Sequence, residues 1–247
     1  MMSNKYAEPS TPLKNADGPI ISGGSVIAIK YDKGILMGAD TMMRYAGCYW
    51  YKDIQRMHQI SDNIVLGSAG DYADLQKTLK MIEEKHELDE IAEDQFEFLG
   101  PKDYCKWLAN LQFNKRMRVD PLYNSHIVAG LDKKSGETYL GTVDLYGNNY
   151  EAPFVWLGIS NYFCRTLLND EVVAGSLTLD RAKELIDGCF LTLYNRDKSQ
   201  SDNIQLVTIQ DDGTITFHEP YTLVADWDYG FTKNMTNDQT RDMRCPS

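Results

Sequence analysis

The segment from Gly23 to Asp40 constrains the fold of this chain more than any other. Val26 to Ile29 is rich in β-branched residues, and Ile35 to Ala39 is apolar. Between these two runs, Asp32-Lys33-Gly34 has the residue types of a tight turn. The segment therefore predicts a β-hairpin whose second strand is buried and ends at a carboxylate.

The composition indicates a globular protein with a sizeable core. Hydrophobic residues make up 43% of the chain, which is typical of globular domains. Because the net charge is -11 and the pI about 4.8, we do not expect a nucleic-acid partner. The five cysteines are an odd number without CxxC spacing, which favours free thiols in a reducing compartment.

Neither a secretory signal nor a membrane span is predicted. Met1 to Pro19 lacks an apolar core, and no apolar run in the chain is long enough to cross a bilayer. We therefore expect an intracellular protein of the cytoplasm, the nucleus or both, with no membrane partner.

Strand and helix patterns alternate in blocks after the hairpin. Tyr49 to Tyr51 and Ile54 to Ile60 suggest a third strand, and Asn63 to Gly67 suggests a fourth. Apolar residues from Tyr72 to Ile82 then recur at the spacing of an amphipathic helix. A second helix is expected to begin at Pro101, because proline suits the first helical position.

The second half of the chain repeats this order. The expected elements are strands at His126 to Leu131, Thr138 to Val143 and Asn148 to Trp156, helices from about Asn161 to Val173 and from the N-cap Thr178, and a hairpin of Asn203 to Ile209 with Thr214 to His218. No linker divides the chain. The order predicts one α+β domain with two antiparallel sheets between two helix pairs, a four-layer αββα sandwich.

We assign residues 23–219 to this domain, residues 1–22 to a polar leader and residues 220–247 to a carboxy-terminal tail. Within the tail, Trp227, Tyr229 and Phe231 are large side chains that follow the last strand of the domain. Each would contribute on the order of 1.5–3 kcal/mol if it were buried against a partner. The alternative is that the tail folds back on its own domain.

Several stretches resemble proteasome β-type subunits. They are Gly67 to Gln76, Asp120 to Asn124, Leu140 to Gly147 with Tyr150 to Pro153, and Leu193 to Asp197. The runs Gly-Asp-Tyr-Ala-Asp from Gly70 and Tyr-Glu-Ala-Pro from Tyr150 are more specific than the hairpin, which any β-type subunit would share. The resemblance spans roughly Gly23 to Phe217. It implies the N-terminal nucleophile hydrolase fold and a place in the 20S proteasome core particle.

Active members of that family use an amino-terminal Thr, whose α-amine is the general base for its own hydroxyl. A lysine lowers proton affinities nearby, a carboxylate holds that lysine, and a backbone N–H stabilises the oxyanion. The resemblance places the nucleophile at Gly24, the carboxylate at Asp40, the lysine at Arg56, the oxyanion glycine at Gly70, a serine at Ile159, a late aspartate at Asp197 and a further serine at Gln200.

Four of these positions lack the residue that active members carry. Gly24 has no hydroxyl, Ile159 is apolar, Gln200 has an amide where the family has a serine, and Arg56 stays charged and cannot shuttle a proton. We therefore expect a catalytically inactive, structural β subunit in which Asp40 and Arg56 form a salt bridge in a collapsed site. No metal or cofactor is expected.

Two rival interpretations remain open. Cleavage between Gly24 and Ser25 would create an amino-terminal serine and thus an active endopeptidase. In that register, however, Thr41 and Met57 replace the carboxylate and the cation. The second rival is a free-standing scaffold of the same fold that is not part of a proteasome.

The resemblance also implies the partners. They are the other α and β subunits of the core particle. Residues 220–247 are expected to form an arm that reaches the opposite β ring, with Trp227, Tyr229 and Phe231 as its anchor.

Overall fold

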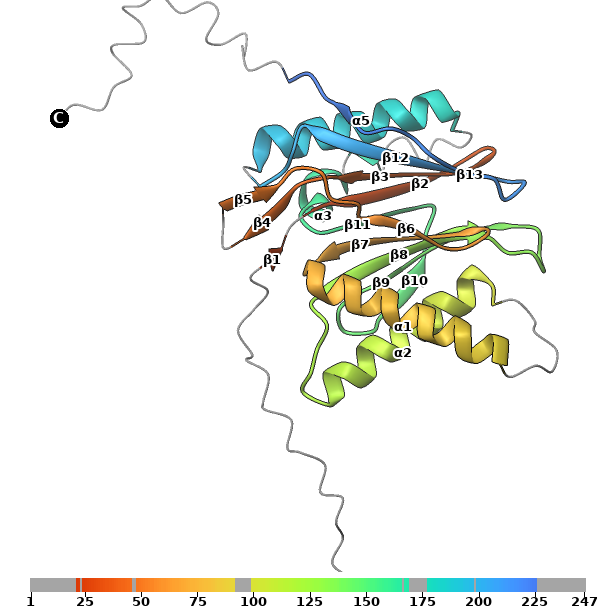
Figure 1. Ribbon diagram of the computed structural model, residues 1–247. Coiled ribbons are helices and arrows are strands. Elements are labelled where there is room, and N and C mark those ends of the chain that lie inside the picture. Colours follow the sequence, from red (N-terminus) through yellow and green to blue (C-terminus); the bar gives the residue numbers. More distant parts are fainter. Residues whose placement is uncertain are drawn as a thin grey trace, which may run out of the picture.

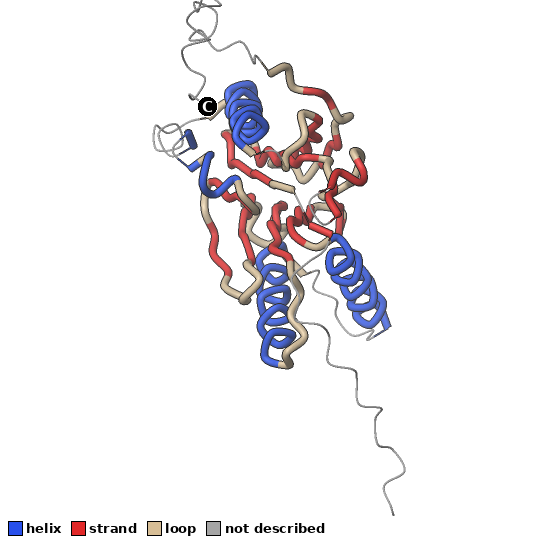
Figure 2. The backbone as a smooth tube through the Cα atoms, turned by 90° about the vertical axis from the view of Figure 1, so that its left-hand side faces the viewer, coloured by secondary structure: helices blue, strands red, loops and turns tan. Residues whose placement is uncertain are grey.

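The structure is a computed structural model that describes residues 21–22, 24–45, 48–91, 99–165, 167–168, 177–197 and 199–225. Two antiparallel sheets lie face to face, with helices on both outer sides (Figure 1). The view turned by 90° shows the same layers, with two long helices below the sheets and one above them (Figure 2). The predicted four-layer αββα sandwich is therefore confirmed.

The first sheet contains the predicted hairpin. Its strand order is β11-β2-β3-β12-β13, with β14 paired to β12. The strands are β2 (Val26–Tyr31), β3 (Gly34–Asp40), β11 (Phe154–Leu157), β12 (Asn203–Gln210), β13 (Ile215–Phe217) and β14 (Tyr221–Thr222). The hairpin strands β2 and β3 pair from Val26↔Ala39 to Tyr31↔Gly34. They lie inside the sheet, because β11 pairs with β2 and β12 pairs with β3.

The second sheet has the order β10-β9-β8-β7-β6. Its strands are β6 (Met57–Ser61), β7 (Ile64–Gly70), β8 (Asn124–Leu131), β9 (Thr138–Val143) and β10 (Asn149–Glu151). A small third sheet is formed by β1 (Ile21–Ser22), β4 (Met43–Tyr45) and β5 (Cys48–Tyr51). The run Tyr49 to Tyr51 therefore lies in a different sheet from β6, whereas the sequence suggested one strand for both.

The expected strand Asn148 to Trp156 is in fact two strands in different sheets. β10 pairs with β9 in the second sheet, and β11 pairs with β2 in the first. Pro153 lies between them and has no N–H to donate to a ladder. Its carbonyl oxygen accepts the Lys30 N–H at 2.8 Å, so the chain crosses between the sheets at this proline.

Helices α1 (Tyr72–Ile91) and α2 (Pro101–Met117) cover the second sheet, while α3 (Ser160–Phe163) and α5 (Leu179–Arg196) cover the first. The predicted first residue of α2 is correct. The Thr178 side chain accepts the Arg181 N–H, as expected of an N-cap. Of the predicted helix Asn161 to Val173, the structure describes α3 and a short helical continuation, and residues 169–176 lie outside the described residues.

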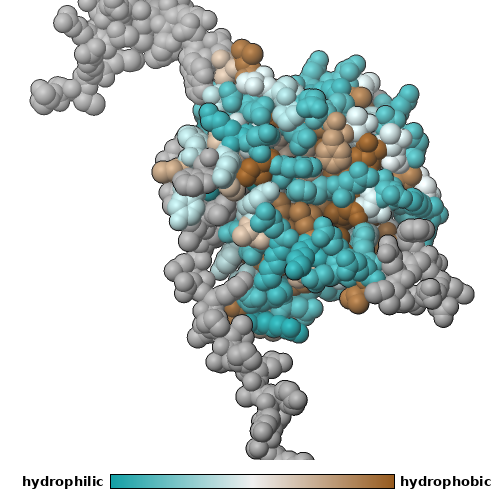
Figure 3. Space-filling model, viewed as in Figure 1, coloured by the Kyte–Doolittle hydropathy of each residue, from teal (hydrophilic) through white to brown (hydrophobic). Residues whose placement is uncertain are grey.

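The hairpin is apolar from Val26 to Ile29 and from Ile35 to Ala39, because both faces of the two strands are buried there. Val26 and Ala28 face the core between the two sheets, whereas Ile27 and Ile29 face the core under α5. A third core lies between the second sheet and helices α1 and α2. On the face shown in Figure 3, hydrophobic residues appear mainly in a band at the level of the sheets, between hydrophilic outer surfaces. No helix in the described part of the chain is long and apolar enough to span a bilayer.

Strand β14 lies inside the segment that the sequence assigned to the tail. Its residues pair with Asn203 and Ile204 of β12, and both Tyr221 and Leu223 pack against the core under α5. The boundary at residue 220 is therefore too early, because the chain stays in its own domain as far as Leu223. The predicted anchor residues Trp227, Tyr229 and Phe231, and residues 1–20 of the leader, lie outside the described residues.

Candidate functional site

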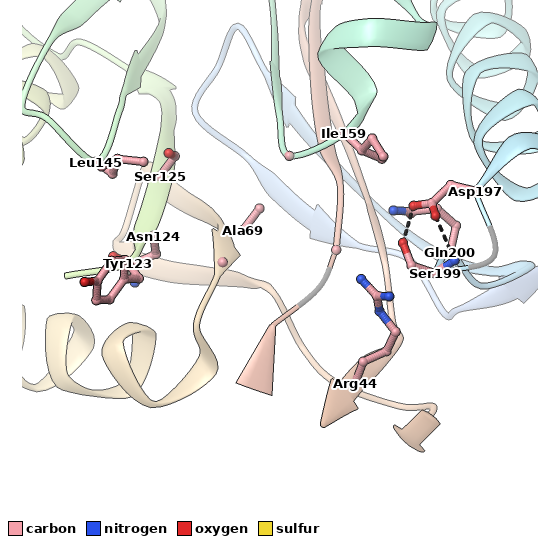
Figure 4. Close-up of a pocket in the computed structure, with 13 residues that line it drawn as sticks. Arg44, Ala69, Tyr123, Asn124, Ser125, Leu145, Ile159, Asp197, Ser199 and Gln200 are labelled. Atoms are coloured by element: carbon pink, nitrogen blue, oxygen red, sulfur yellow. Dashed lines mark hydrogen bonds between the residues drawn. The ribbon is translucent and has the colours of Figure 1, made fainter. Parts of the chain in front are cut away.

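The fold brings most of the predicted site positions to one cavity of about 390 Å³ (Figure 4). Gly24, Gly70, Ile159, Asp197 and Gln200 line it. Each lies at the end of an element, namely before β2, at the end of β7, before α3, and after α5. Residues far apart in sequence therefore meet where two sheets and two helices end.

Asp40 and Arg56 do not line this cavity but lie buried behind it. Their side chains are 0% and 3% exposed. The Arg56 Nε donates to the Asp40 carbonyl oxygen at 3.0 Å and lies 3.3 Å from Asp40 Oδ1, and the guanidinium also donates to the Met42 carbonyl. The predicted salt bridge is thus present, and it is tied to the backbone of β3 and the following turn.

The Asp40 carboxylate also organises the start of β2. Its Oδ1 accepts the Ser25 N–H at 2.8 Å. Burial raises the pKa of Asp40, while the Arg56 charge and the backbone N–H groups oppose this shift by stabilising the carboxylate. A carboxylate that is fully buried needs such partners. In this structure Asp40 therefore has a structural role: it pairs with Arg56 and holds the Ser25 N–H at the start of β2.

The Arg56 side chain fills the space in front of Gly24. A Cβ at Gly24 would collide with the Nε and the guanidinium carbon of Arg56. Gly24 also has φ +95°, a conformation that glycine adopts much more readily than other residues. The nucleophile position is therefore closed to a side chain both by its backbone and by its neighbour.

Gly70, the position of the oxyanion glycine in the resemblance, makes a close backbone approach to the start of β8. Its φ is +128°, and a Cβ there would collide with the Tyr123 carbonyl oxygen and lie 2.7 Å from the Asn124 Cα. The next residue, Asp71, caps α1 by accepting the Ala73 N–H at 2.8 Å. The close packing of the backbone is therefore sufficient to explain why the turn between β7 and α1 has a glycine at position 70.

The turn around Ile159 presents an apolar side chain to the cavity. Ile159 also packs against the core under α5. The hydroxyl of the following residue, Ser160, is buried and donates to the Leu157 carbonyl at 2.7 Å. That hydroxyl is therefore committed to a backbone carbonyl and does not line the cavity.

The turn from Asp197 to Gln200 is stabilised by hydrogen bonds between its own residues. The Ser199 backbone N–H donates to Asp197 Oδ1 at 3.0 Å, the Ser199 hydroxyl donates to Oδ2, and the Gln200 N–H donates to the Asp197 carbonyl at 3.1 Å. Figure 4 marks the contacts of the Asp197 carboxylate with dashed lines at the edge of the cavity. The Asp197 carboxylate thus holds its own turn together.

Sequence reasoning missed Arg44, which lines the cavity from β4. Its side chain points toward the turn of Asp197 to Gln200 (Figure 4). On the opposite side of the cavity lie Tyr123, Asn124, Ser125 and Leu145. No sequence pattern indicated Arg44, since its proximity to this turn depends on the pairing of the small third sheet.

The alternative nucleophile Ser25 is inaccessible in the folded chain. Its side chain is fully buried, it is not among the residues that line the cavity, and its own N–H is held by Asp40. Among the described residues that line the cavity there is no histidine, lysine or cysteine. The hydroxyl of Ser199, which also lines the cavity, is hydrogen-bonded to the Asp197 carboxylate of its own turn. Within the described residues, no cluster of three or more His, Cys, Asp or Glu side chains forms a metal site.

The four-layer fold, with this cavity where the sheets end, is that of the N-terminal nucleophile hydrolases. The chain belongs to the proteasome subunit family, because the family model described as "Proteasome subunit" matches residues 20–209. It is 32% identical to proteasome subunit beta type-4 of Arabidopsis thaliana over 240 residues, which cover 92% of this chain and 96% of the relative.

Further relatives carry two names. The chain is 30% identical to proteasome subunit beta type-4 of Xenopus laevis over 88% of both chains. It is 31% identical to proteasome subunit beta type-7 of Saccharomyces cerevisiae, over 84% of this chain and 80% of the relative. The resemblance to proteasome β-type subunits that the sequence motifs indicated is confirmed.

Proposed function

We propose that this chain is a non-catalytic, structural β subunit of the 20S proteasome core particle, at the seventh β position of the ring. The position of the Arg56 guanidinium, in the space that a nucleophile side chain at Gly24 would occupy, carries this proposal. Relatives named proteasome subunit beta type-4 over most of the chain support the assignment to the β ring.

The chemistry of the site argues for inactivity at each step. Gly24 supplies no hydroxyl, and Arg56 replaces the lysine with a group that keeps its proton. The salt bridge with Asp40 holds that arginine in place. Of the cavity hydroxyls, that of Ser199 donates to the Asp197 carboxylate, which holds its own turn together, and neither Ser125 nor Ser199 is an amino-terminal residue whose α-amine could be the base.

The role that follows is architectural. The subunit completes a ring with the other α and β subunits, and the particle degrades proteins in the ATP- and ubiquitin-dependent pathway in the cytoplasm and nucleus. The tail beyond Leu223 acts as an arm toward the opposite β ring, with Trp227, Tyr229 and Phe231 as its anchor. The packing of β14 supports a fixed starting point for this arm, because Tyr221 and Leu223 are held by the domain.

The test is to express the full chain with an affinity tag as the only copy in cells, and to fractionate the native extract. We expect the chain to elute with the other proteasome subunits, far above its own 28.1 kDa. In those particles, an epoxyketone probe for N-terminal nucleophiles should label other subunits and leave this one unlabelled.

Two outcomes contradict the proposal in different ways. Probe labelling of this chain would support the active endopeptidase that uses Ser25. Elution of the chain at its own mass would support the free-standing scaffold.

A further inference from the structure

Arg44 is the only cationic side chain among the described residues that line the cavity at the ends of the sheets. It is partly buried, and its Nε is buried without a hydrogen-bond partner. The lining also contains one described carboxylate, that of Asp197, and both of its oxygens accept hydrogen bonds from Ser199 of the same turn. The guanidinium therefore has a donor that is available to a ligand in the cavity.

Gln200 offers an acceptor beside this cation. Its side chain is 4% exposed, and its Oε1 is buried without a hydrogen-bond partner. Gln200 lies in the turn toward which the Arg44 side chain points (Figure 4). An amide oxygen can only accept a hydrogen bond, so its partner must be an N–H or O–H group.

Asn124, on the opposite side of the cavity, offers a second donor (Figure 4). It is 2% exposed, and its Nδ2 has no hydrogen-bond partner. The orientation of this amide is fixed by Gln112, whose Nε2 donates to both the carbonyl oxygen and the Oδ1 of Asn124 at 3.1 Å. Because Oδ1 must face the Gln112 donor, Nδ2 is the atom of Asn124 that remains to bind a ligand.

These three groups make a site that the catalytic chemistry of the family does not explain. The resemblance places a serine at Gln200 and gives the Arg44 side chain no role. Buried polar groups without a partner are costly and uncommon, so three of them around one cavity require an explanation. The cavity volume of about 390 Å³ lies within the range of small-molecule sites, and Ala69, Leu145 and Ile159 add apolar lining.

We propose that the cavity binds a small organic carboxylate that carries an amide beside the carboxyl group, which is the chemistry of an N-acylated amino acid. Arg44 binds the carboxylate, Gln200 Oε1 accepts the ligand N–H, and Asn124 Nδ2 donates to the acyl oxygen. The ligand side chain packs against Ile159. A free N-acyl amino acid and the carboxyl end of a peptide share this chemistry. The inference goes beyond the proposed function and does not depend on it.

Two matched pairs of probes test the site on the full chain with labelled isoleucine methyl groups. N-acetylleucine and N-acetylleucine amide differ in the charge of the carboxyl group. We expect the acid to shift the Ile159 methyl resonance and to bind on the order of tenfold more tightly than the amide, because its contact with Arg44 is charge-assisted. The peptide Ala-Ala-Leu and its carboxy-terminal amide distinguish the sources: tighter binding of this acid too means that peptide ends enter the site, and discrimination confined to N-acetylleucine means a free small carboxylate.

The variants should affect the two N-acetylleucine probes differently. Arg44→Gln should weaken the acid by about tenfold and leave the amide unchanged, whereas Arg44→Lys keeps the charge and should weaken the acid by no more than about threefold. Gln200→Met should weaken both probes by about fivefold, since both carry the N–H that Gln200 accepts. Arg118→Gln is the control: Arg118 is an exposed arginine outside the cavity, so the same change of charge should leave both affinities unaltered.

Three outcomes overturn the inference. Equal affinities of the wild type for acid and amide would mean that no carboxylate is recognised, and this result does not depend on the folding of any variant. Equal loss with Arg44→Gln and Arg118→Gln would mean that only the net charge matters. No shift of the Ile159 resonance at millimolar probe would mean that water alone satisfies the buried groups. A chain that binds N-acetylleucine but elutes at its own mass would overturn the proposed function and leave this site standing.

Discussion

The guanidinium of Arg56 occupies the space that a Cβ at Gly24 would need. The two residues are far apart in sequence, but the salt bridge to Asp40 fixes the arginine at the start of β2. The backbone at Gly24, with φ +95°, suits a residue without a side chain. The ion pair and the backbone conformation thus leave no room for a side chain at Gly24.

Gly24→Thr should not create peptidase activity, because the added hydroxyl would lack a lysine and would compete with Arg56 for space. We also expect a loss of stability of about 1–3 kcal/mol from overpacking and from the strained φ. Epoxyketone labelling and thermal unfolding of the purified chain measure the two effects.

The matched control for the overpacking is a pair of alanine substitutions. Gly24→Ala should destabilise the chain. Gly188→Ala should be neutral or stabilising, because a Cβ at Gly188 meets nothing within 4 Å and because alanine favours the helical conformation that Gly188 has in α5. Equal melting temperatures for these two variants would contradict the assignment of Arg56 to this space.

Breaking the ion pair of Asp40 and Arg56 should be costly. Arg56→Met leaves a buried carboxylate without its cation, and Asp40→Asn leaves a buried guanidinium without its anion, so each should cost about 3–5 kcal/mol. The double variant should cost less than the sum of the two, because it leaves no unpaired charge. Denaturant unfolding of the wild type, the two single variants and the double variant measures the coupling free energy between Asp40 and Arg56. If the losses of unfolding free energy in the single variants add up to the loss in the double variant, the contact contributes little.

Gly70→Val should prevent normal folding and assembly. The side chain would collide with the backbone at Tyr123 and Asn124, and we expect a loss on the order of 3 kcal/mol or more. Gly136→Val separates the two causes: Gly136 has φ +71° but a Cβ there meets nothing within 4 Å, so only strain of about 1–2 kcal/mol remains. Unfolding curves that coincide for the two variants would mean that the close approach is unimportant.

The stability of the folded chain should fall in acid because of His126. Burial lowers the pKa of this histidine from 6.5 to about 4. Between these values the unfolded chain binds a proton that the folded chain does not, so stability is lost as the pH falls from 6.5 to 4, by about 3 kcal/mol in total.

The test for His126 compares the wild type with His126→Gln, which has no titrating group at this position. The difference in unfolding free energy between the two proteins should depend on pH only within that window. A difference that stays constant from pH 7 to pH 4 would mean that the histidine is protonated in the folded state.

Truncation after Leu223 should leave the domain intact and impair the joining of two half-particles. Tyr221 and Leu223 remain packed under α5 in this variant, so the subunit should still enter its own ring. Accumulation of half-particles on native gels is the expected readout, and a normal yield of complete core particles would contradict the arm.

A second truncation, after Pro220, provides the comparison for the arm. It removes β14 and its pairing with β12, so it should destabilise the subunit itself. If the truncation after Leu223 also destabilised the subunit, then the segment would be part of the domain and not an arm.

The sequence by itself determined the elements whose signals are local. The hairpin follows from two apolar runs and Asp32-Lys33-Gly34 between them, and the starts of α2 and α5 follow from Pro101 and Thr178. These signals involve residues close together in the chain, so turn chemistry and capping are enough to read them. The motifs also indicated the family, which the comparisons confirm.

Only the tertiary structure decided how distant residues meet. β10 and β11 belong to different sheets, and the cavity includes Arg44, because strand pairing between remote segments places them there. In the same way, the sequence pairs Asp40 with Arg56 but does not show that the guanidinium closes the space at Gly24. Such contacts depend on how side chains from different layers pack against one another. They leave no periodic pattern in the local sequence, so sequence reasoning does not detect them.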